Sequence, residues 1–366
     1  MRVVLCRPSD LGTSDLARWR GFQQTTRELA SPFLTPEFAL AADRTRPWVR
    51  VAVIHDDGEI VGYLPYSKRT LSLGSGVAPG LSGVIGVIQG RDEHINLAEL
   101  ASHVHLNGWS FNTLLATQAE AGFWRSVDSL AVRIDSDFES YLEGLRVNSG
   151  TRLRAWALKR LRRMEREHEQ VKFVNSPSAE LLSAFHRLKN RQVRERGWFG
   201  QLDKPWVRAM MEDLATERSD ALSGLLTGLV VDGRIAAVNF YLRSRTDVAH
   251  WHTAYDPDFG LYSPGGLLFF HDLERFAVEG VRFVDMGAGA NALKKHFSND
   301  KIQLLEGFVG RTGNVGRLLN SLAPQGRALR ERAPKVERQL RALLHKLDGT
   351  SHMSRKNATE SASDED

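Results

Sequence analysis

The chain has 366 residues, with 49 Lys and Arg against 44 Asp and Glu, a net charge of +5, and 42% hydrophobic residues. Because a domain usually holds about 100–200 residues, this length predicts two folded units and a tail, and the composition excludes a disordered or fibrous protein. The single cysteine, Cys6, excludes an internal disulfide and a thiolate zinc site, and it favours a reducing compartment. No run of residues approaches the ~20 apolar residues of a membrane span. We therefore expect a cytoplasmic protein, with any membrane contact peripheral and at the inner face.

The first half of the chain has the pattern of a mixed α/β unit. The expected elements are a helix at 14–28, a turn that opens a short helix at 31–38, strands at 49–55 and 60–66, a glycine-rich stretch at 74–90, a helix at 95–105, a strand at 111–116 and a helix start at 138–145. The turn Asp56-Asp57-Gly58 is typical of a tight hairpin between the two strands.

After a helix predicted at 152–169, the second half repeats this order. The expected elements are a strand at 171–174, helices at 179–194 and 204–216, strands at 223–231, 234–242 and 248–255, a helix at 264–278, a strand at 283–286, a helix at 291–296 and a strand at 302–310. Asp232-Gly233 again marks a hairpin. The repeated order predicts a duplication, with units at 1–145 and 170–310, a linker helix at 146–169, a basic helical extension at 311–350 and a disordered tail at 351–366.

Positive charge is concentrated in two segments. Residues 146–172 hold nine Lys and Arg against three Glu, and residues 311–350 hold nine against three acidic residues. Such segments suit the phosphates of nucleic acid, of anionic lipid or of a nucleotide-bearing ligand, and they are equally typical of a solvated helix face. Of the two, 311–350 is the segment expected to contact an anionic membrane.

Several common chemistries find no motif in this sequence. A His-Glu-x-x-His pair, a Walker phosphate loop and a Gly-x-Ser-x-Gly elbow are all absent from it. Gly287-Ala288-Gly289 is too short for a dinucleotide fingerprint, because Ala292 stands where the third glycine would be. Zinc hydrolysis, phosphate-loop nucleotide chemistry and the commonest serine-hydrolase arrangement therefore lose support.

Residues 251–297 carry a series of motifs that resembles a known family. The series runs through Ala254-Tyr255-Asp256 at a strand end, Ser263-Pro264-Gly265 at a helix start, the run Asp285–Gly289, Lys294 and Phe297. It looks like the CelD-like branch of the GNAT acyltransferases, and it is similar to the Fem-type peptidyltransferases, which carry two GNAT-like units in one chain. The resemblance implies a tandem duplicated GNAT-like α/β fold with a mixed sheet. It also implies an enzyme that transfers an acyl group from acetyl-CoA or another acyl-CoA to an amine.

The donor is expected at a helix start. Ser263, Pro264, Gly265 and Gly266 would present bare backbone N–H groups to an anionic pyrophosphate, although the same residues also make an ordinary capped helix. The resemblance assigns coenzyme A to this turn. We add Lys294 as a further cofactor-binding candidate, and we expect no metal.

Acyl transfer requires a polarised carbonyl, an unprotonated amine and a proton donor for the leaving thiolate. The catalytic candidates are His252, Tyr255 and Asp285. Because His252 and Tyr255 lie three residues apart on one strand, they should point to opposite faces. His252 and Tyr255 can each also be interpreted as packed core side chains, and Asp285 as a cap of the turn that follows its strand.

The acceptor is expected near the end of the helix at 179–194. The candidates there are Arg191, Arg194 and Trp198, together with Trp251 on the strand. Guanidinium groups can fork onto a carboxylate or phosphate, yet exposed arginines at a helix end need no ligand. The expected acceptor is a small-molecule or envelope-precursor amine in polysaccharide, cell-envelope or lipid-linked metabolism.

Two other functions stay open from sequence. The first is a Fem-like transferase that uses aminoacyl-tRNA as donor. The second is a non-catalytic protein: it could bind nucleic acid through the basic helix at 152–166 with Trp156, or bind a partner with the duplicated fold and a degraded cofactor loop. That helix lacks the aromatic sheet or reading helix of a known nucleic-acid module, so nucleic acid is not the expected partner.

Overall fold

The computed structural model describes residues 1–312 except 92, 119–122, 176–177, 196–201 and 203. Trp198, the tail at 351–366 and nearly all of the basic extension at 311–350 lie outside the described residues. Within the described part of the chain, no helix is both long and apolar enough to cross a membrane.

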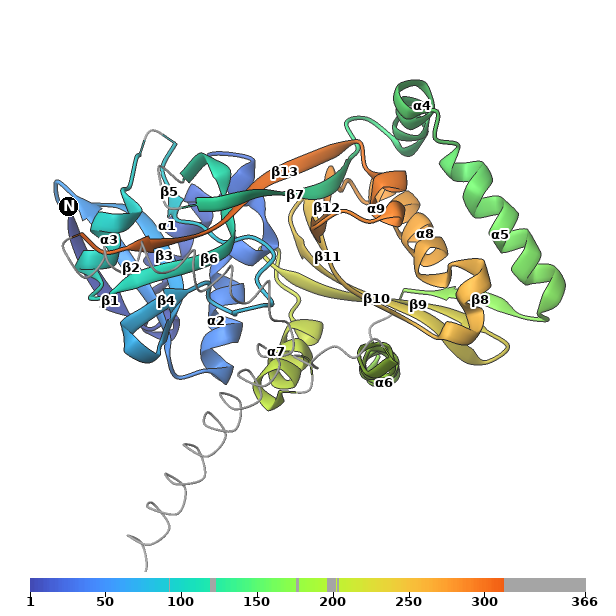
Figure 1. Cartoon of the computed structure of the whole chain (residues 1–366), viewed down its shortest axis with the longest axis horizontal. Helices are drawn as coiled ribbons and strands as arrows, with labels where there is room; N and C mark the ends of the chain where they lie inside the picture. Colours follow the sequence, from blue (N-terminus) through green and yellow to red (C-terminus); the bar gives the residue numbers. More distant parts are fainter. Residues whose placement is uncertain (92, 119–122, 176–177, 196–201, 203, 313–366) are drawn as a thin grey trace, which may run out of the picture.

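The described part of the first half contains the strands β1 to β7 and the longer helices α1 to α4 (Figure 1). They are β1 (Arg2–Cys6), α1 (Thr13–Phe22), α2 (Pro36–Thr45), β2 (Val49–Asp56), β3 (Glu59–Arg69), β4 (Leu73–Ser75), β5 (Ile88–Gln89), α3 (Leu97–His103), β6 (Gly108–Leu115), β7 (Phe123–Arg133) and α4 (Phe138–Ser149). The α2 start follows local chemistry, since Pro36 occupies the first turn and the Thr35 hydroxyl accepts a hydrogen bond from the Phe38 N–H at 3.1 Å.

The second half begins with the basic helix and ends with a long strand. Its elements are α5 (Leu153–Glu167), β8 (Val171–Val174), α6 (Ala179–Glu195), α7 (Pro205–Thr216), β9 (Ser223–Val231), β10 (Arg234–Ser244), β11 (Asp247–Tyr255), α8 (Pro264–Val278), β12 (Phe283–Ala288), α9 (Ala292–Phe297) and β13 (Asp300–Gly310). These bounds confirm most of the expected elements. Four strands, β1, β4, β5 and β7, were not among those predicted from the pattern.

All strands belong to one sheet whose order is symmetric about its centre. The order is β1-β2-β3-β4-β6-β13-β7-β12-β11-β10-β9-β8, with β5 paired to β3. Counted inward from the two edges of the sheet, β1, β2, β3, β4 and β6 take the same places in the first half as β8, β9, β10, β11 and β12 take in the second. Each half contains a parallel pair at the same place, β4 with β6 and β11 with β12, among otherwise antiparallel neighbours. The structure is therefore a tandem GNAT-like fold, as the resemblance implied.

The two Asp-Gly turns occupy equivalent positions in this arrangement. One joins β2 to β3 and the other joins β9 to β10. In both, the aspartate and the glycine have positive φ: 46° and 88° at Asp57 and Gly58, 48° and 75° at Asp232 and Gly233. Positive φ at both central residues is the geometry of a tight hairpin turn, so the equivalence predicted from sequence is confirmed.

The halves exchange their last strands. Strand β7 pairs with β12 of the second half, and β13 pairs with β6 of the first half. The two exchanged strands also pair with each other along most of their length. A division of the chain at residue 145 therefore separates strands that the sheet joins, and Figure 1 shows β7 and β13 running side by side between the halves.

Helices cover both faces of the second half. In Figure 1, α5, α8 and α9 lie on one face of the sheet, and α6 and α7 lie on the other. On the α6 side the core continues into the first half, because Phe33 and Phe38 each lie with their ring centroids 6.3 Å from that of Trp251 on β11. The Trp251 indole N–H also donates to the Leu81 carbonyl at 2.9 Å. Strand β11 is thus held against the first half of the chain.

A glycine fixes α7 against β9. A Cβ added to Gly224 would lie 1.9 Å from the Leu214 carbonyl oxygen, a backbone atom that cannot move aside. We expect Gly224→Ala to lower the free energy of unfolding by at least about 2 kcal/mol, in the range of overpacked cores. Gly144→Ala is the control, because nothing lies within 4 Å of that position in α4 and the helix should gain about 0.5–1 kcal/mol. Urea denaturation measures both; equal stabilities would contradict the packing argument.

Candidate functional site

The site begins where two parallel strands separate. Strands β11 and β12 pair from Asp247 with Phe283 to Ala249 with Asp285. Beyond Ala249, β11 continues to Tyr255 and keeps only β10 as its partner among the described strands. The edge of β11 that faces the opening therefore has no ladder partner. Side chains of α6 already bond two carbonyls of this stretch: Lys189 donates to Thr253 at 2.8 Å and Gln192 donates to Tyr255 at 3.1 Å. An extended ligand would therefore bind the N–H groups that remain along this edge.

A β-bulge lies at this opening. Phe240 pairs with His252 and Tyr241 with His250, so Trp251 is the extra residue. As a result Trp251 and His252 share one face, with ring centroids 5.1 Å apart. His252 packs against Phe185 of α6, so this shared face is the α6 side.

The helix that follows β11 starts at the opening. The N-cap of α8, Ser263, has a left-handed φ of 53°, and its side chain makes no capping hydrogen bond. Pro264 takes the first helical position, as predicted. The first N–H groups of a helix have no partner within the helix, and together with the helix dipole they suit the binding of an anion.

The glycines of this turn serve packing. A Cβ at Gly265 would lie 2.8 Å from the Thr253 methyl carbon, and one at Gly266 would lie 2.8 Å from the edge of the Trp156 ring. Both glycines are buried. They allow α8 to approach β11 and α5 closely, so an anion would reach the helix from its open end at Ser263.

Helix α5 brings a cation to the same place. Trp156 lies against Gly266, and the Arg160 guanidinium lies 4.5 Å from the centroid of the Trp156 ring. Arg160 shares the face of α5 that carries the buried residues Leu153, Ala157 and Met164. Its buried Nε has no hydrogen-bond partner among the described residues. From the sequence, Arg160 was counted only as one charge of a basic segment. Its spacing could have distinguished it from the solvated arginines: it follows Ala157 by three residues and precedes Met164 by four, which places it on the apolar face of the helix.

Lys294 lies on α9, beside the end of β12. Its ammonium donates to the carbonyls of Gly287 at 2.8 Å, Gly289 at 3.2 Å and Ala288 at 3.4 Å. Burial lowers the pKa of this lysine. Because an ammonium has three donors, these contacts use all of them and shape the loop after β12.

The predicted catalytic residues lie on different faces. His252 faces α6, while Tyr255 packs into the cluster that includes Ala157 of α5 and Leu268 of α8. The opposite directions predicted for these two residues are observed. Burial lowers the pKa of His252 to about 3, so its ring is neutral at physiological pH, and its buried Nε2 has no partner among the residues described.

Asp285 lies on β12 and lines a cavity of about 60 Å³ between the two halves, together with Arg27, Ser31, Asp247 and Lys301. Its Oδ1 accepts hydrogen bonds from the Ser129 hydroxyl and, at 2.9 Å, from the Gly287 N–H. Its buried Oδ2 has no partner in the described chain. Burial raises the pKa of Asp285, and it raises the pKa of Asp247 to about 6.

His250 was missed by sequence reasoning. Its Nε2 lies 2.6 Å from the Thr253 hydroxyl, which in turn donates to Asn239 at 2.8 Å. The Asn239 amide and the Tyr241 hydroxyl both donate to the fully buried Asp272 of α8, at 3.2 Å and 2.6 Å. This chain of hydrogen bonds fixes β10, β11 and α8 relative to one another. No local sequence signal marks it, because its members are 33 residues apart at the extremes and meet only in the folded sheet.

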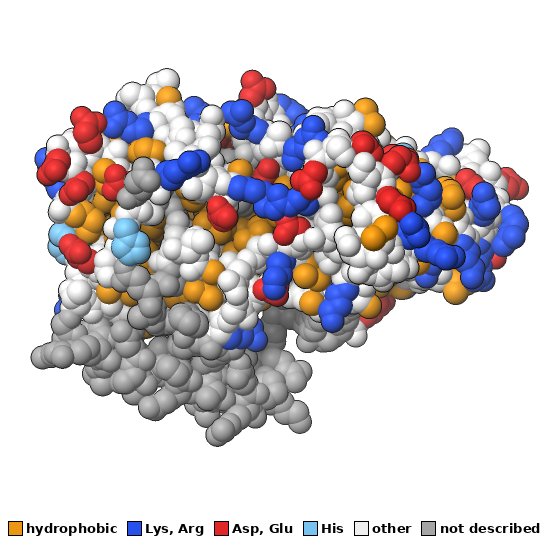
Figure 2. All heavy atoms as spheres, turned by 90° about the horizontal axis from the view of Figure 1, so that it is seen from above, with side chains coloured by type: hydrophobic (Ala, Val, Ile, Leu, Met, Phe, Trp, Pro, Cys, Tyr) orange, Lys and Arg blue, Asp and Glu red, His pale blue; other side chains and the backbone are white. Residues whose placement is uncertain are grey.

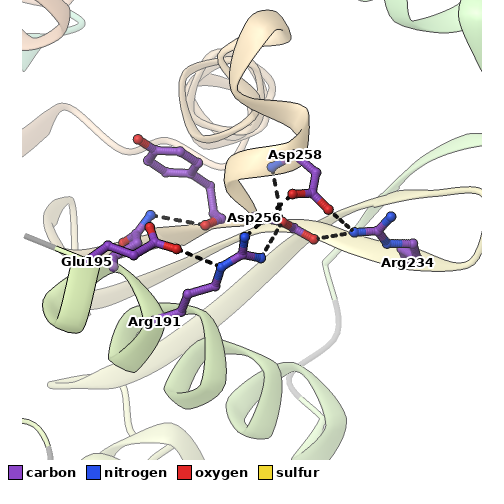
Figure 3. Close-up of polar contacts among 7 residues, drawn as sticks. Arg191, Glu195, Arg234, Asp256 and Asp258 are labelled. Atoms are coloured by element: carbon purple, nitrogen blue, oxygen red, sulfur yellow. Dashed lines mark hydrogen bonds and ion pairs between the residues drawn. The ribbon is translucent and has the colours of Figure 1, made fainter.

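Arg191 belongs to an ion-pair cluster at the start of the β11–α8 connection (Figure 3). It contacts Glu195 at 2.9 Å, Asp256 at 3.3 Å and Asp258 at 3.6 Å. From the other side Arg234 contacts Asp256 at 2.7 Å and Asp258 at 2.9 Å. Each exposed pair contributes little stability, but the cluster holds the segment that leads into α8. Arg194, by contrast, is exposed near the end of α6.

Among the described residues, no group of three or more His, Cys, Asp or Glu side chains is placed to hold a metal ion.

Comparison with known proteins agrees with this geometry. Residues 151–295 match the family model described as "Acetyltransferase (GNAT) domain". No curated protein matches the sequence. The fold is similar to that of FemX, with a TM-score of 0.54, 11% identity, and 84% of this chain and 96% of that chain covered.

Two further solved structures show the same likeness. One is the C-terminal domain of a lysylphosphatidylglycerol synthetase, so named, from Agrobacterium fabrum: TM-score 0.51, 12% identity, 87% of this chain and 98% of that chain covered. The other is a conserved protein of unknown function from Bacteroides thetaiotaomicron: TM-score 0.50, 13% identity, 82% and 97% covered. At these identities the likeness shows the fold. Residues 151–295 thus match a GNAT acetyltransferase domain, and the chain as a whole has the tandem GNAT-like fold that it shares with FemX.

Proposed function

We propose that this protein transfers an acyl group from a phosphate-bearing acyl donor, acyl-CoA, to a primary amine. The observation that carries the proposal is the opening between β11 and β12 with the uncapped start of α8 beside it. An extended donor could bind the remaining N–H groups along the edge of β11 that has no ladder partner, while its phosphates meet the helix start. This arrangement requires little covalent chemistry from the protein, since binding and orientation supply most of the rate.

The donor side has the charges that a pyrophosphate needs. The first turn of α8 and the Arg160 guanidinium flank Trp156. No side chain caps the helix start. Arg160 donates from Nη1 to the Trp156 carbonyl at 3.4 Å, and its Nε has no partner within the described chain. A bound phosphate would satisfy the helix start and this Nε with charge-assisted hydrogen bonds. These residues therefore fit coenzyme A, which would supply the acyl group as a thioester.

The acceptor side is the cavity that Asp247 and Asp285 line. The cations Arg27 and Lys301 line this cavity beside the two carboxylates, and a carboxylate suits an incoming ammonium group. The amine must lose a proton before or as it attacks the thioester carbonyl carbon. The Oδ2 of Asp285 is a suitable acceptor, because burial raises the pKa of this carboxyl and makes the carboxylate a stronger base. The C–N bond then forms, the C–S bond breaks, and the thiolate takes a proton from solvent. His252 and Trp251 lie together on the α6 side of the sheet.

We extend the proposal to four details that the sequence suggested. They are the CelD-like branch, the cytoplasmic location, an acceptor from polysaccharide, cell-envelope or lipid-linked metabolism, and contact of 311–350 with an anionic membrane. An aminoacyl-tRNA donor is the main alternative. The Lys and Arg side chains that gather at the α5 end of the molecule (Figure 2) would suit either donor.

Binding measurements test the donor assignment. We expect coenzyme A to raise the melting temperature and pantetheine, which lacks the phosphates of coenzyme A, to raise it much less. Arg160→Gln should weaken coenzyme A binding about 10-fold, since a hydrogen bond to a charged group contributes about 1.5–3 kcal/mol. Arg162→Gln is the matched control, because that side chain is exposed on the same helix. Isothermal titration gives both affinities.

The outcomes separate the two donors. Equal affinities in the two variants would remove Arg160 from the site. Stabilisation by an aminoacyl-tRNA but by no acyl-CoA would replace the proposed donor with the Fem-like one.

A further inference from the structure

A second pocket lies in the first half of the chain, away from the β11–β12 opening. It has a volume of about 280 Å³ and lies at the ends of β1, β2 and β3, beside the residues that follow α3. Three cationic side chains line it, Arg7, Arg50 and Lys68, against a single carboxylate, Asp10. His105 also borders it.

The strand register brings the cations together. Cys6 pairs with Val51, which places Arg7 beside Arg50, and Arg50 pairs with Tyr66, two residues before Lys68. Like charges on neighbouring strands repel each other. The cluster therefore carries an energetic cost that a bound anion would remove.

Only part of this charge is neutralised within the described chain. Arg7 pairs with the buried Asp43 at 2.9 Å, and Arg50 directs one nitrogen to the carbonyls of Pro47 and Val49 at 2.8 Å and 2.7 Å. Asp10 accepts from the Arg7 backbone N–H at 2.8 Å. Neither Arg50 nor Lys68 has a carboxylate partner among the residues that the structure describes.

A buried hydroxyl completes the set of donors. Tyr66 is 1% exposed and lines the pocket. Burial raises the pKa of Tyr66 to about 12, so its hydroxyl stays protonated and can donate a hydrogen bond at physiological pH. A guanidinium, an ammonium and a phenol thus meet at one pocket, and all of them donate.

We propose that this pocket binds a phosphate monoester, either on a small molecule or on a lipid headgroup. A phosphate offers several charged oxygens to the three kinds of donor, and charge-assisted hydrogen bonds of this kind are strong. Leu5 and Val104 give the pocket an apolar wall for the carbon part of the ester. The site is independent of the donor site on α8, and it neither requires nor excludes acyl transfer.

The test uses glycerol 3-phosphate as probe and the full-length protein. We expect saturable binding by isothermal titration, weakened about 10-fold by Lys68→Gln and about threefold by Tyr66→Phe. Arg69→Gln is the matched control, because Arg69 is an exposed neighbour on the same strand and points to the opposite face. It removes the same charge and should change the affinity less than twofold, well below the effect of a lost charged hydrogen bond.

Two further measurements separate this site from the donor site and identify the source of the phosphate. Arg160→Gln should leave glycerol 3-phosphate binding unchanged even if coenzyme A binding is lost. If the ligand is a lipid headgroup, vesicles of phosphatidylcholine with phosphatidic acid should bind the wild type better than the Lys68→Gln variant. If glycerol 3-phosphate binds and the vesicles do not, the ligand is a small molecule. The proposal is overturned if neither probe binds, or if Arg69→Gln weakens binding as much as Lys68→Gln.

Discussion

Replacing Asp285 with asparagine should reduce the rate of acyl transfer about 10²–10⁴-fold, the contribution typical of a general base. The amide keeps an oxygen to accept from Ser129 and Gly287, but it puts an NH₂ group where Oδ2 faces the cavity. The measurement is release of CoA thiol from acetyl-CoA with a primary amine selected by screening. In the wild type, the rate should fall as pH falls through the raised pKa of Asp285, because the carboxyl must be ionised to accept a proton.

Stability provides the control for this variant. The pKa of Asp285 is raised in the folded protein, so folding favours the protonated carboxyl. The free energy of unfolding therefore falls as pH rises through that pKa. A neutral amide removes this loss, so Asp285→Asn should be at least as stable as the wild type at pH 7. An active variant with the acidic limb of the pH profile intact would exclude Asp285 as the base.

Ser263→Asp should weaken coenzyme A binding about 10- to 100-fold. Two unit charges ~5 Å apart repel by roughly 3 kcal/mol at an effective dielectric constant of ~20, and salt reduces this figure. The new carboxylate would lie at the open end of α8, where the donor phosphates are expected. Gly265→Asp is a poorer test, because any side chain there would collide with Thr253 and loosen α8 from β11.

The substitution at Ser263 should preserve the fold. Aspartate tolerates the left-handed backbone better than most residues, and a negative charge favours a helix N-terminus. Ser263→Asn is the matched neutral control and should bind coenzyme A nearly as well as the wild type. If Asp and Asn variants bind equally, measured by isothermal titration, the donor phosphates do not meet this helix start.

Much of the local structure could be predicted from the sequence. The Asp-Gly hairpins, the helix start at Pro264 and the boundaries of β8, β9 and α8 follow from turn chemistry and periodicity, which act over a few residues. The duplication was visible because the order of elements repeats along the chain. The donor turn was found the same way, from residues adjacent in sequence.

The arrangement of the site was decided by tertiary structure. Strand β7 has no strong pattern of its own, and it is a strand because β12 and β13 flank it on either side. The bulge at Trp251 sets the face that His252 occupies, and a bulge depends on pairing with β10. Arg160, His250 and the pocket formed by Arg50, Tyr66 and Lys68 acquire their surroundings from elements distant in the chain. The sequence by itself determined most of the elements and the family that their motifs resemble, because local backbone preferences act within one segment. Which side chains meet was decided only by the folded sheet, because that depends on the register and the exchange of strands between distant segments.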